Sequence, residues 1–551
     1  MFRKSHTKSE NYPIDLIVYV GGYCYFCNRF SGRPYNDSAS GNVSREDMID
    51  FTPIARRLLC PKAARTSLYP GRVEALQRAE LTALMRRLAM TAYGRRHGVA
   101  EAPAPASVYE RLLALPVVDY EELRPEVMRM IGGEKDVLWP GRCRYFAQSS
   151  GTSGGKSKYI PVTAVSLQRN HYRGAGDSVG HYLLSNPGSR MFSGKGLILG
   201  GSFANEVPSA AMAPGVKIGD LSATLIDRIP FGAGLFRIPD KRIALMPDWT
   251  EKLPQLARAA MDEDVTNLSG VPSWFLGVIR EVLELKGCER ATDVWPNLEV
   301  FFHGGIAFGP YRDEYRSLCD PAKMHYMETY NASEGFFAYA TTPGAGRMQL
   351  LLDGGVFYEF APPGGGDPVP AWQVREGKVY EMLITAANGL WRYRLGDTVR
   401  IEDADRMLIT IAGRTKSFIN AFGEEVMEYN ADAAISAAAA ATGARIRNYT
   451  VAPVYAAAGR RGRHQWVIEW ITLPADAARF AEVLDATLQS VNSDYQAKRS
   501  HSLFLDPPLV TTVPEGTFDR WLATHGNGRL GGQRKIPRLS NDRKILTDLG
   551  L

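Results

Sequence analysis

The chain has too few cysteines for a disulfide-stabilised scaffold. The six cysteines among its 551 residues are Cys24, Cys27, Cys60, Cys143, Cys288 and Cys319. Thiols spread so thinly over a large protein are typical of a reducing compartment, so a cytoplasmic location is expected. Cys24 and Cys27 form a CxxC pair, but no second pair and no histidine pair stands at the spacing of a zinc site. Ordinary thiols are therefore the favoured interpretation.

Long hydrophobic runs are also missing. The most apolar stretch near the amino terminus covers residues 14–26, contains Gly21 and Gly22, and is preceded by Glu10. A helix that crosses a bilayer needs about 20 apolar residues. Neither a membrane anchor nor a signal peptide is expected here.

The chain carries little excess of one charge. Lysine and arginine total 65 and aspartate and glutamate total 59, which gives a net charge of +6, and the basic residues are scattered. No motif that combines aromatic and basic residues accompanies this charge. Nucleic acid and membrane partners are therefore not expected, whereas ATP or another small anion is compatible with the sequence.

The composition is that of a globular protein with more than one domain. Hydrophobic residues make up 45% and charged residues 23%, and 551 residues exceed the usual span of one hydrophobic core. Residues 1–47 lack helical or strand periodicity, which predicts a poorly ordered leader. Residues 73–93 place apolar side chains on one helical face, which predicts a core helix that ends at Gly94.

Strand-like and helical segments alternate in the middle of the chain. Apolar runs predict strands at residues 196–199, 265–268, 298–302 and 324–329, and a helix at 274–285. This alternation predicts an α/β domain with mixed sheets and flanking helices, whose site lies in the loops after the strands.

A smaller unit is expected after Gly413. Strands are predicted at residues 448–454, 465–472 and 509–513, together with a helix whose apolar face runs from Phe480 to Tyr495. These elements predict a compact α+β domain. We therefore expect three parts: a leader at 1–47, a large domain at 48–413 and a small carboxyl-terminal domain at 414–551. A hinge at residues 413–417 is expected to join the two domains.

The most informative motif follows a predicted strand at residues 144–147. It reads Gln-Ser-Ser-Gly-Thr-Ser-Gly-Gly-Lys-Ser-Lys over residues 148–158. Small side chains let backbone N–H groups approach phosphate oxygens, and Lys156 adds positive charge, so a phosphate-binding loop is predicted. Gly151 and Gly155 enclose three residues instead of the four of a Walker A loop. Because no helix is predicted to follow either, a kinase or GTPase is disfavoured, and a flexible surface loop is the alternative.

Three further segments, taken with that loop, resemble a known family. They read Tyr-Asn-Ala-Ser-Glu-Gly at 330–335, Trp-Arg-Tyr-Arg-Leu-Gly-Asp at 391–397 and Gly-Arg-Thr-Lys at 413–416, and His-Gly-Gly at 303–305 precedes them. Their order and spacing resemble the adenylate-forming acyl ligases, and more closely the Gretchen Hagen type of acyl acid-amido synthetases. The resemblance runs from about residue 51 to the carboxyl terminus. It implies a large amino-terminal adenylate-forming domain and a small α+β domain on a hinge.

The resemblance also implies which residues surround the ATP. Lys156 would lie beside the phosphates, and Gly304 and Arg414 would contact the nucleotide. The other residues of the phosphate loop would be Ser149, Ser150, Gly151, Thr152 and Ser153.

Three residues of the other motifs are implied to hold the adenosine and a metal ion. Tyr330 would pack on the adenine, Asp397 would accept hydrogen bonds from the ribose hydroxyls, and Glu334 would bind Mg²⁺. An aromatic face and two carboxylates suit these roles. As alternatives, Tyr330 is an ordinary core residue, Glu334 is a solvated charge, and Asp397 is the salt-bridge partner of Arg394 or Arg400.

A lysine near the carboxyl terminus is implied to act in catalysis. The segment Gly-Gln-Arg-Lys-Ile-Pro-Arg at 532–538 resembles the one that brings a lysine to the reacting phosphate in this family. Attack of a carboxylate on the α-phosphate brings two anions together, so Lys535, delivered by domain closure, would lower the barrier. A basic solvated tail is the alternative. The hinge departs from the wider pattern, with Ser417 where related ligases often carry an acidic residue.

The resemblance implies a two-step reaction with ATP and Mg²⁺. A carboxylic acid and ATP give an acyl adenylate and pyrophosphate, and an amine or amino acid then displaces AMP to form an amide. An acyl-CoA or carrier-thiol ligase is the alternative, and a silent nucleotide-binding protein is a third, disfavoured because Lys156, Glu334, Asp397 and Lys535 occur together. Both partners are small molecules. Pocket walls expected at residues 201–212, 271–274 and 332–336 suggest a partly apolar acid.

Overall fold

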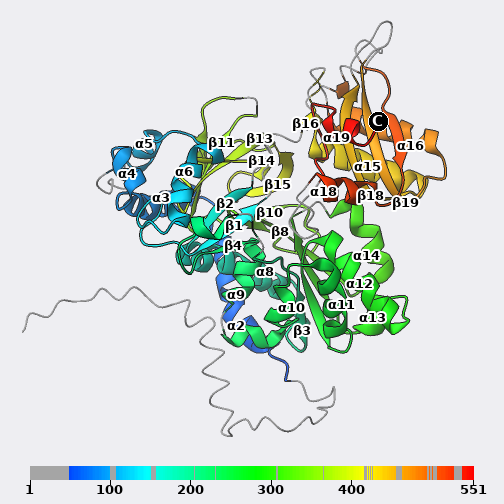
Figure 1. Cartoon of the computed structure of the whole chain (residues 1–551), viewed down its shortest axis with the longest axis horizontal. Coiled ribbons are helices and arrows are strands. Elements are labelled where there is room, and N and C mark those ends of the chain that lie inside the picture. Colours follow the sequence, from blue (N-terminus) through cyan, green and yellow to red (C-terminus); the bar gives the residue numbers. More distant parts are fainter. Residues whose placement is uncertain are drawn as a thin grey trace, which may run out of the picture.

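A computed structural model describes most of the chain after the leader (Figure 1). The small carboxyl-terminal domain, coloured yellow to red, lies at the upper right of the large one. The predicted leader at 1–47 lies outside the described residues. The structure describes residues 49–551 except 100–106, 150–156, 204, 206, 230, 306–307, 364, 415–417, 420, 422–423, 425, 455–461, 493–494, 497–498, 500–504 and 526–535.

The large domain begins with helices. They are α2 (Thr52–Ala63), η2 (Ala64–Leu68), α3 (Val73–Leu88), α4 (Ala92–Arg96), α5 (Val108–Leu113) and α6 (Tyr120–Ile131). The helix predicted at 73–93 is therefore two helices, and the prediction that Gly94 ends it was wrong. The Thr91 hydroxyl caps α4 by accepting a hydrogen bond from Gly94 N at 2.9 Å. A Cβ at Gly94 would lie 2.1 Å from Leu88 O, so glycine is needed where α4 packs against the end of α3.

A small sheet holds the two ends of the predicted phosphate loop. Strand β1 (Tyr145–Ser149) pairs antiparallel with β2 (Lys158–Val162) and parallel with β4 (Lys217–Gly219). Ser149, at the end of β1, stands opposite Lys158, at the start of β2. A strand begins at Lys158, whereas a helix follows the loop of a Walker A motif.

Twelve strands of the described chain form one large sheet. Five of them, in the order β8-β7-β6-β3-β5, are parallel, and the remaining strands continue antiparallel from β9. From edge to edge the strands are β12 (Val369–Pro370), β11 (Val356–Ala361), β13 (Val379–Ala386), β14 (Tyr393–Asp403), β15 (Leu408–Arg414), β10 (Met348–Leu350), β9 (Gly335–Tyr339), β8 (His325–Ala332), β7 (Val300–Gly304), β6 (Val265–Gly270), β3 (Lys195–Ile198) and β5 (Arg237–Ile238). The predicted α/β class with mixed sheets is confirmed.

Helices cover both faces of the parallel part. Buried side chains of α11 and α12 meet those of β3, β6 and β7 in one apolar cluster, and α2 and α8 share another with β7 and β8. No helix in the described ranges is long and apolar enough to cross a bilayer. The remaining helices of this domain are α7 (Ala164–Ser166), the π-helix η4 (Leu167–His171), α8 (Tyr172–Ser185), η5 (Ser209–Ala211), α9 (Leu221–Asp227), η6 (Phe231–Phe236), α10 (Lys241–Ala244), α11 (Trp249–Ala260), α12 (Pro272–Lys286), α13 (Ala291–Val294), η7 (Gly309–Tyr311), α14 (Arg312–Leu318) and η8 (Ala371–Gln373).

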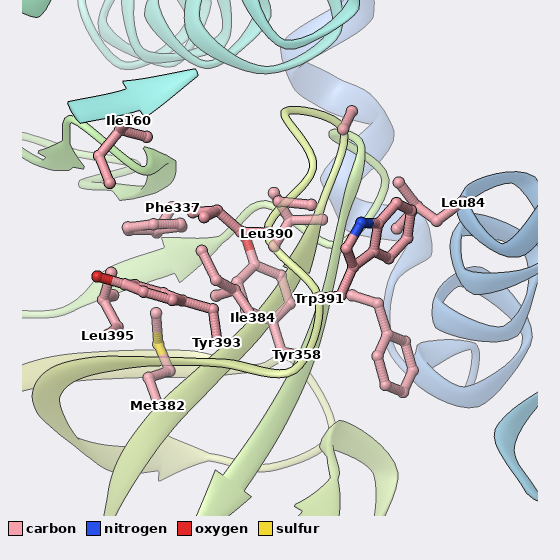
Figure 2. Close-up of a cluster of buried hydrophobic side chains, with 14 of the residues drawn as sticks. Leu84, Ile160, Phe337, Tyr358, Met382, Ile384, Leu390, Trp391, Tyr393 and Leu395 are labelled. Carbon is pink, nitrogen blue, oxygen red and sulfur yellow. The ribbon is translucent and has the colours of Figure 1, made fainter. Parts of the chain in front are cut away.

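The antiparallel part of the sheet supplies the largest apolar core. Figure 2 shows Trp391 on the side of Leu84 from α3, whereas Tyr393 lies on the side of Ile160 and Phe337. The Trp391 indole donates a hydrogen bond to Leu138 O at 2.9 Å. The same cluster contains Tyr393 of β14 and Ile160 of β2, so the core joins β14 to the small sheet that carries the ends of the phosphate loop.

The small domain is the predicted α+β unit. Its sheet has the order β18-β19-β20, with the first pair antiparallel and the second parallel. The predicted helix ends at Val491, so Tyr495, which is buried, follows the helix instead of extending it. The elements are β16 (Phe418–Ile419), β17 (Val426–Met427), α15 (Glu428–Thr442), β18 (Arg445–Val454), β19 (Arg463–Thr472), α16 (Ala477–Val491), β20 (Leu509–Val513), α18 (Thr517–Thr524) and α19 (Lys544–Asp548).

The two domains meet where the small domain lies beside α14 (Figure 1). The Glu314 side chain, which is 7% exposed, forms an ion pair with Arg280 of its own domain. It also lies 3.5 Å from Arg445 Nη2 of β18 in the small domain. Glu314 is thus shared between an arginine of each domain.

A buried imidazole predicts how the large domain responds to acid. His171 is 3% exposed, and burial lowers its pKa to about 4. The unfolded chain, with a histidine pKa near 6.5, binds a proton that the folded chain excludes, so stability present above pH 6.5 is lost as the pH falls towards 4. When the pH falls from 7.5 to 5, protonation of His171 in the unfolded chain should lower the free energy of unfolding of the wild type by about 2 kcal/mol. The variant His171→Asn should not show this loss. Urea unfolding at both pH values measures this, and equal losses in the two proteins would contradict it.

Candidate active site

The site is built around a hydrogen bond between two residues that the sequence singled out. Tyr330 lies in β8 and Asp397 in β14, and both side chains are buried, with exposures of 5% and 6%. The Tyr330 hydroxyl donates to Asp397 Oδ2 at 2.7 Å. Three other strands separate β8 from β14 in the sheet, so this contact joins segments that are not neighbours in the ladder.

Glu334 lies at the turn that follows Tyr330. The turn joins β8 to β9, and the Glu334 side chain is largely buried. Two asparagines hold the backbone here: Asn388 Nδ2 donates to Glu334 O at 2.9 Å, and Asn170 accepts from Phe336 N at 2.6 Å and donates to Phe336 O at 2.9 Å. The carboxylate therefore projects from a fixed turn.

Lys158 is a cation of this site that the sequence reasoning missed. Its Nζ donates to the Tyr393 hydroxyl at 3.3 Å and lies 5.9 Å from the ring centroids of Tyr120 and Tyr393. Burial raises the pKa of Tyr393, and the charges of Glu334 and Asp397 add to that effect. Lys158 therefore contacts a phenol on which the charges of Glu334 and Asp397 act. Lys158 belongs to the glycine-rich motif in the sequence. Only its position at the start of β2 shows that its side chain lies beside Tyr120 and Tyr393.

Two further predicted residues contribute backbone positions at the same ends of the strands. A Cβ at Gly304, the last residue of β7, would lie 2.4 Å from Thr329 O, so only glycine fits there. Arg414, the last residue of β15, stands opposite Asp397 in the antiparallel register. Ser149 likewise ends β1. The other predicted site residues lie outside the described residues, and they are Ser150, Gly151, Thr152, Ser153, Lys156 and Lys535.

The contacts of Tyr330, Asp397 and Glu334 bear on the alternative roles of these residues. Tyr330 does belong to the main apolar core, but its hydroxyl is directed at Asp397. Among the described contacts, Arg394 pairs with Glu381 and Arg400 donates to the Tyr429 hydroxyl at 3.1 Å, so these two arginines have partners other than Asp397. Glu334 is too buried for a solvated charge.

The carboxylate of Glu334 suits a magnesium ion that is held mainly by phosphates. In the part of the chain that the structure describes, no group of three or more His, Cys, Asp or Glu side chains could hold a metal by itself. Mg²⁺ at ATP sites commonly takes one or two carboxylates and completes its shell with phosphate oxygens and water. Cys24 and Cys27 lie outside the described residues.

The fold is that of the adenylate-forming ligases. A solved acyl acid amido synthetase, AtGH3.15 in complex with 2,4-DB, superposes with a TM-score of 0.73 at 18% identity, over 90% of this chain and 96% of that one. A 2-hydroxyisobutyryl-CoA ligase in the postadenylation state has a TM-score of 0.53 at 14% identity, over 94% of this chain and 97% of that one.

Sequence comparison places the chain in a family. The GH3 family N-terminal domain matches residues 68–324, the central domain residues 349–407 and the C-terminal domain residues 429–544, so the chain belongs to the GH3 family. A probable indole-3-acetic acid-amido synthetase of Arabidopsis thaliana is 24% identical over 78% of this chain and 83% of its own length. The protein is an ATP-dependent acyl acid-amido synthetase, which activates a carboxylic acid as its adenylate and transfers the acyl group to an amine or amino acid.

Proposed function

We propose that Asp397, Tyr330 and Glu334 divide the recognition of Mg·ATP between them. Asp397 accepts hydrogen bonds from the ribose hydroxyls, Tyr330 packs against the adenine, and Glu334 binds Mg²⁺. The observation that carries this proposal is the 2.7 Å hydrogen bond between Tyr330 and Asp397, with Glu334 on the turn directly after β8. The Tyr330 hydroxyl fixes the Asp397 carboxylate before the nucleotide arrives, which lowers the entropy cost of binding.

The phosphates are proposed to lie between the glycine-rich loop and Lys158. Ser149 and Lys158 mark the two ends of that loop in the described structure. A cation there would stabilise the charge that develops when the acid attacks the α-phosphate. The same proposal includes the backbone at Gly304, the guanidinium of Arg414, and the loop residues Ser150, Gly151, Thr152, Ser153 and Lys156.

The proposed division into domains, 48–413 and 414–551, is supported by the separate cores. The apolar clusters that contain β3–β15 use residues up to Ile409, and the other clusters begin at Ile419. A chain that crosses between separate cores only once can act as a hinge. Lys535, in the small domain, is proposed to reach the α-phosphate when the domains close.

The acid is proposed to be partly apolar, and the enzyme to act in the cytoplasm. Phe336 follows the Glu334 turn and packs so closely on α8 that a Cβ at Gly174 would lie 2.2 Å from its ring. We propose that this ring forms part of the wall beside the reacting carboxylate, which would favour an acid with a ring or a hydrocarbon chain. The scattered cysteines support the location.

A thiol acceptor is the second candidate function. The observation that favours it is the likeness in fold to a 2-hydroxyisobutyryl-CoA ligase at a TM-score of 0.53. The adenylation step is common to both, so only the acceptor separates them. Offering coenzyme A and amino acids to the same acyl adenylate, and weighing the products by mass spectrometry, decides between the two.

Pyrophosphate exchange tests the first step. The purified protein should exchange labelled pyrophosphate into ATP only when Mg²⁺ and a suitable carboxylic acid are both present. A panel of aryl, indolyl and aliphatic acids finds the acid, and omission of Mg²⁺ is the control. ATP binding without exchange across the whole panel would contradict the proposal and would favour a silent nucleotide-binding protein.

A further inference from the structure

Two polar residues face the same side of the sheet one step before the candidate site. His303 of β7 stands opposite Glu328 of β8 in the parallel register, so both side chains project from one face. The residues that follow them, Gly304 and Thr329, stand opposite each other in the same register, and Thr329 Oγ1 donates to His303 O at 3.1 Å. This pair therefore adjoins the ATP site without being part of it.

The His303 ring is buried with an unused nitrogen. Its side chain is 3% exposed, and Nδ1 has no hydrogen-bond partner in the described structure. One face of the ring stacks on Phe308, with centroids 4.3 Å apart. Burial, helped by the charge of Arg312, lowers the pKa of His303 to about 3. Buried polar groups are usually hydrogen-bonded, so this neutral imidazole has one nitrogen available to a polar ligand.

Glu328 and Arg312 place opposite charges beside this imidazole. Glu328 is half-buried, and burial raises its pKa against the opposing effect of Arg312. Arg312 opens α14, is exposed, and acts electrostatically on both Glu328 and His303. Over the described residues, neither charged side chain forms a hydrogen bond or ion pair. Within the described residues, the carboxylate, the guanidinium and Nδ1 of the imidazole therefore have no hydrogen-bond partner.

This cluster lies where the two domains meet. Tyr311, next to Arg312, is so buried that its pKa is raised, and the charges of Arg538 and Asp432 from the small domain act on it. Helix α14 lies beside the small domain in Figure 1. Arg312 is therefore an exposed cation at the place where the two domains meet.

We propose that His303, Glu328 and Arg312 bind the acceptor of the second step as an amino acid zwitterion. Glu328 and His303 hold the amino group, and Arg312 pairs with the carboxylate, as guanidinium groups commonly do. The proposal rests on the proposed function, because it needs an acyl adenylate beside the ends of β7 and β8. It goes further by assigning the acceptor to three residues outside the ATP site.

The chemistry requires a base, and Glu328 is placed to act as one. An amino acid arrives as an ammonium ion, which has no lone pair, so the Glu328 carboxylate first accepts one proton. The nitrogen then bonds to the acyl carbon, the bond from that carbon to the phosphate oxygen breaks, and AMP leaves with the electron pair. The second proton on nitrogen passes to solvent, and the amide remains. A carboxyl with a raised pKa suits this transfer better than an ordinary one.

Variants of two of these residues should impair only the second step. Each is assayed for pyrophosphate exchange, for hydroxamate formation with hydroxylamine, which needs no acceptor site, and for amide formation. Two acceptors are compared. The first is the one of the twenty amino acids that the wild-type protein uses best, and the second is the amine that corresponds to that amino acid without its carboxylate. Arg312→Ala should raise KM for the amino acid about 10- to 100-fold and leave that for the amine unchanged. Glu328→Gln should lower amide formation about a hundredfold with both.

Matched controls separate this site from the ATP site. Arg316→Ala removes an exposed arginine one turn further along α14 and should change nothing. Both test variants should keep wild-type exchange and hydroxamate formation. An equal loss of exchange and of amide formation, an unchanged KM for the amino acid in Arg312→Ala, or a wild type that accepts only thiols would overturn the proposal. Failure of the proposed function is distinct, since wild-type protein would then show no exchange.

Discussion

Replacing Glu334 by glutamine should abolish adenylation while leaving the protein folded. The change keeps the shape of the side chain and removes the charge that would bind Mg²⁺, so pyrophosphate exchange should fall on the order of a thousandfold, as expected when a metal contact worth several kcal/mol is lost. The turn itself should survive, because Asn388 and Asn170 hold it through backbone atoms of Glu334 and Phe336. Exchange rates over a range of Mg²⁺ concentrations measure the effect.

A matched variant shows whether the loss of any carboxylate from this domain has the same effect. Glu376→Gln removes an exposed carboxylate of the same domain and should behave as the wild type. Thermal unfolding of Glu334→Gln should also match the wild type. Near-normal turnover with an unchanged Mg²⁺ requirement would give Glu334 a structural role and refute its assignment as a metal ligand.

Replacing Asp397 by asparagine should weaken ATP recognition at the ribose. Hydrogen bonds to a charged acceptor are worth about 1.5–3 kcal/mol, so kcat/KM for ATP should fall about 10- to 100-fold. The asparagine side chain also presents an amide where the Tyr330 hydroxyl now donates to a carboxylate, so the pair is weakened as well. Pyrophosphate exchange at varied ATP concentration gives the ratio.

An altered nucleotide shows whether the ribose is the partner. With 3′-deoxy-ATP in place of ATP, the kcat/KM of wild-type protein should fall by most of the factor that Asp397→Asn causes with ATP. The kcat/KM of the Asp397→Asn variant should fall little further when 3′-deoxy-ATP replaces ATP. Tyr330→Phe, which removes only the hydroxyl, should give a smaller loss than Asp397→Asn. Independent, additive losses from the deoxy substrate and the Asp397 variant would show that this carboxylate does not contact the ribose hydroxyl.

The sequence predicted the order of elements better than their ends. Strands β3, β6, β7 and β8 lie where apolar runs placed them, because buried parallel strands are continuously apolar. The strand predicted at 324–329 continues to Ala332, so Tyr330 lies within β8, where it can face Asp397. Apolar composition does not reveal this extension, since Asn331 interrupts the run while the backbone pairing with β9 continues.

Candidate residues can be predicted where local motifs carry them, but not where strands bring distant residues together. Short motifs that resemble a family single out Glu334, Tyr330 and Asp397 as candidates. A loop motif does not show where the following strand begins, so it does not single out Lys158. His303 and Glu328 were not paired, because their proximity depends on the register of β7 and β8, which no short motif encodes.

The shared ion pair of Glu314 bears on how the domains can separate. Breaking a buried pair is usually costly because the remaining charge has no partner. If Arg445 withdraws with the small domain, however, Arg280 stays with Glu314 and keeps its carboxylate neutralised. Arg445 itself is partly exposed, so water can take over its hydration at once. The contact between Arg445 and Glu314 therefore favours one arrangement of the domains only modestly. It can break and form again each time the domains separate and meet.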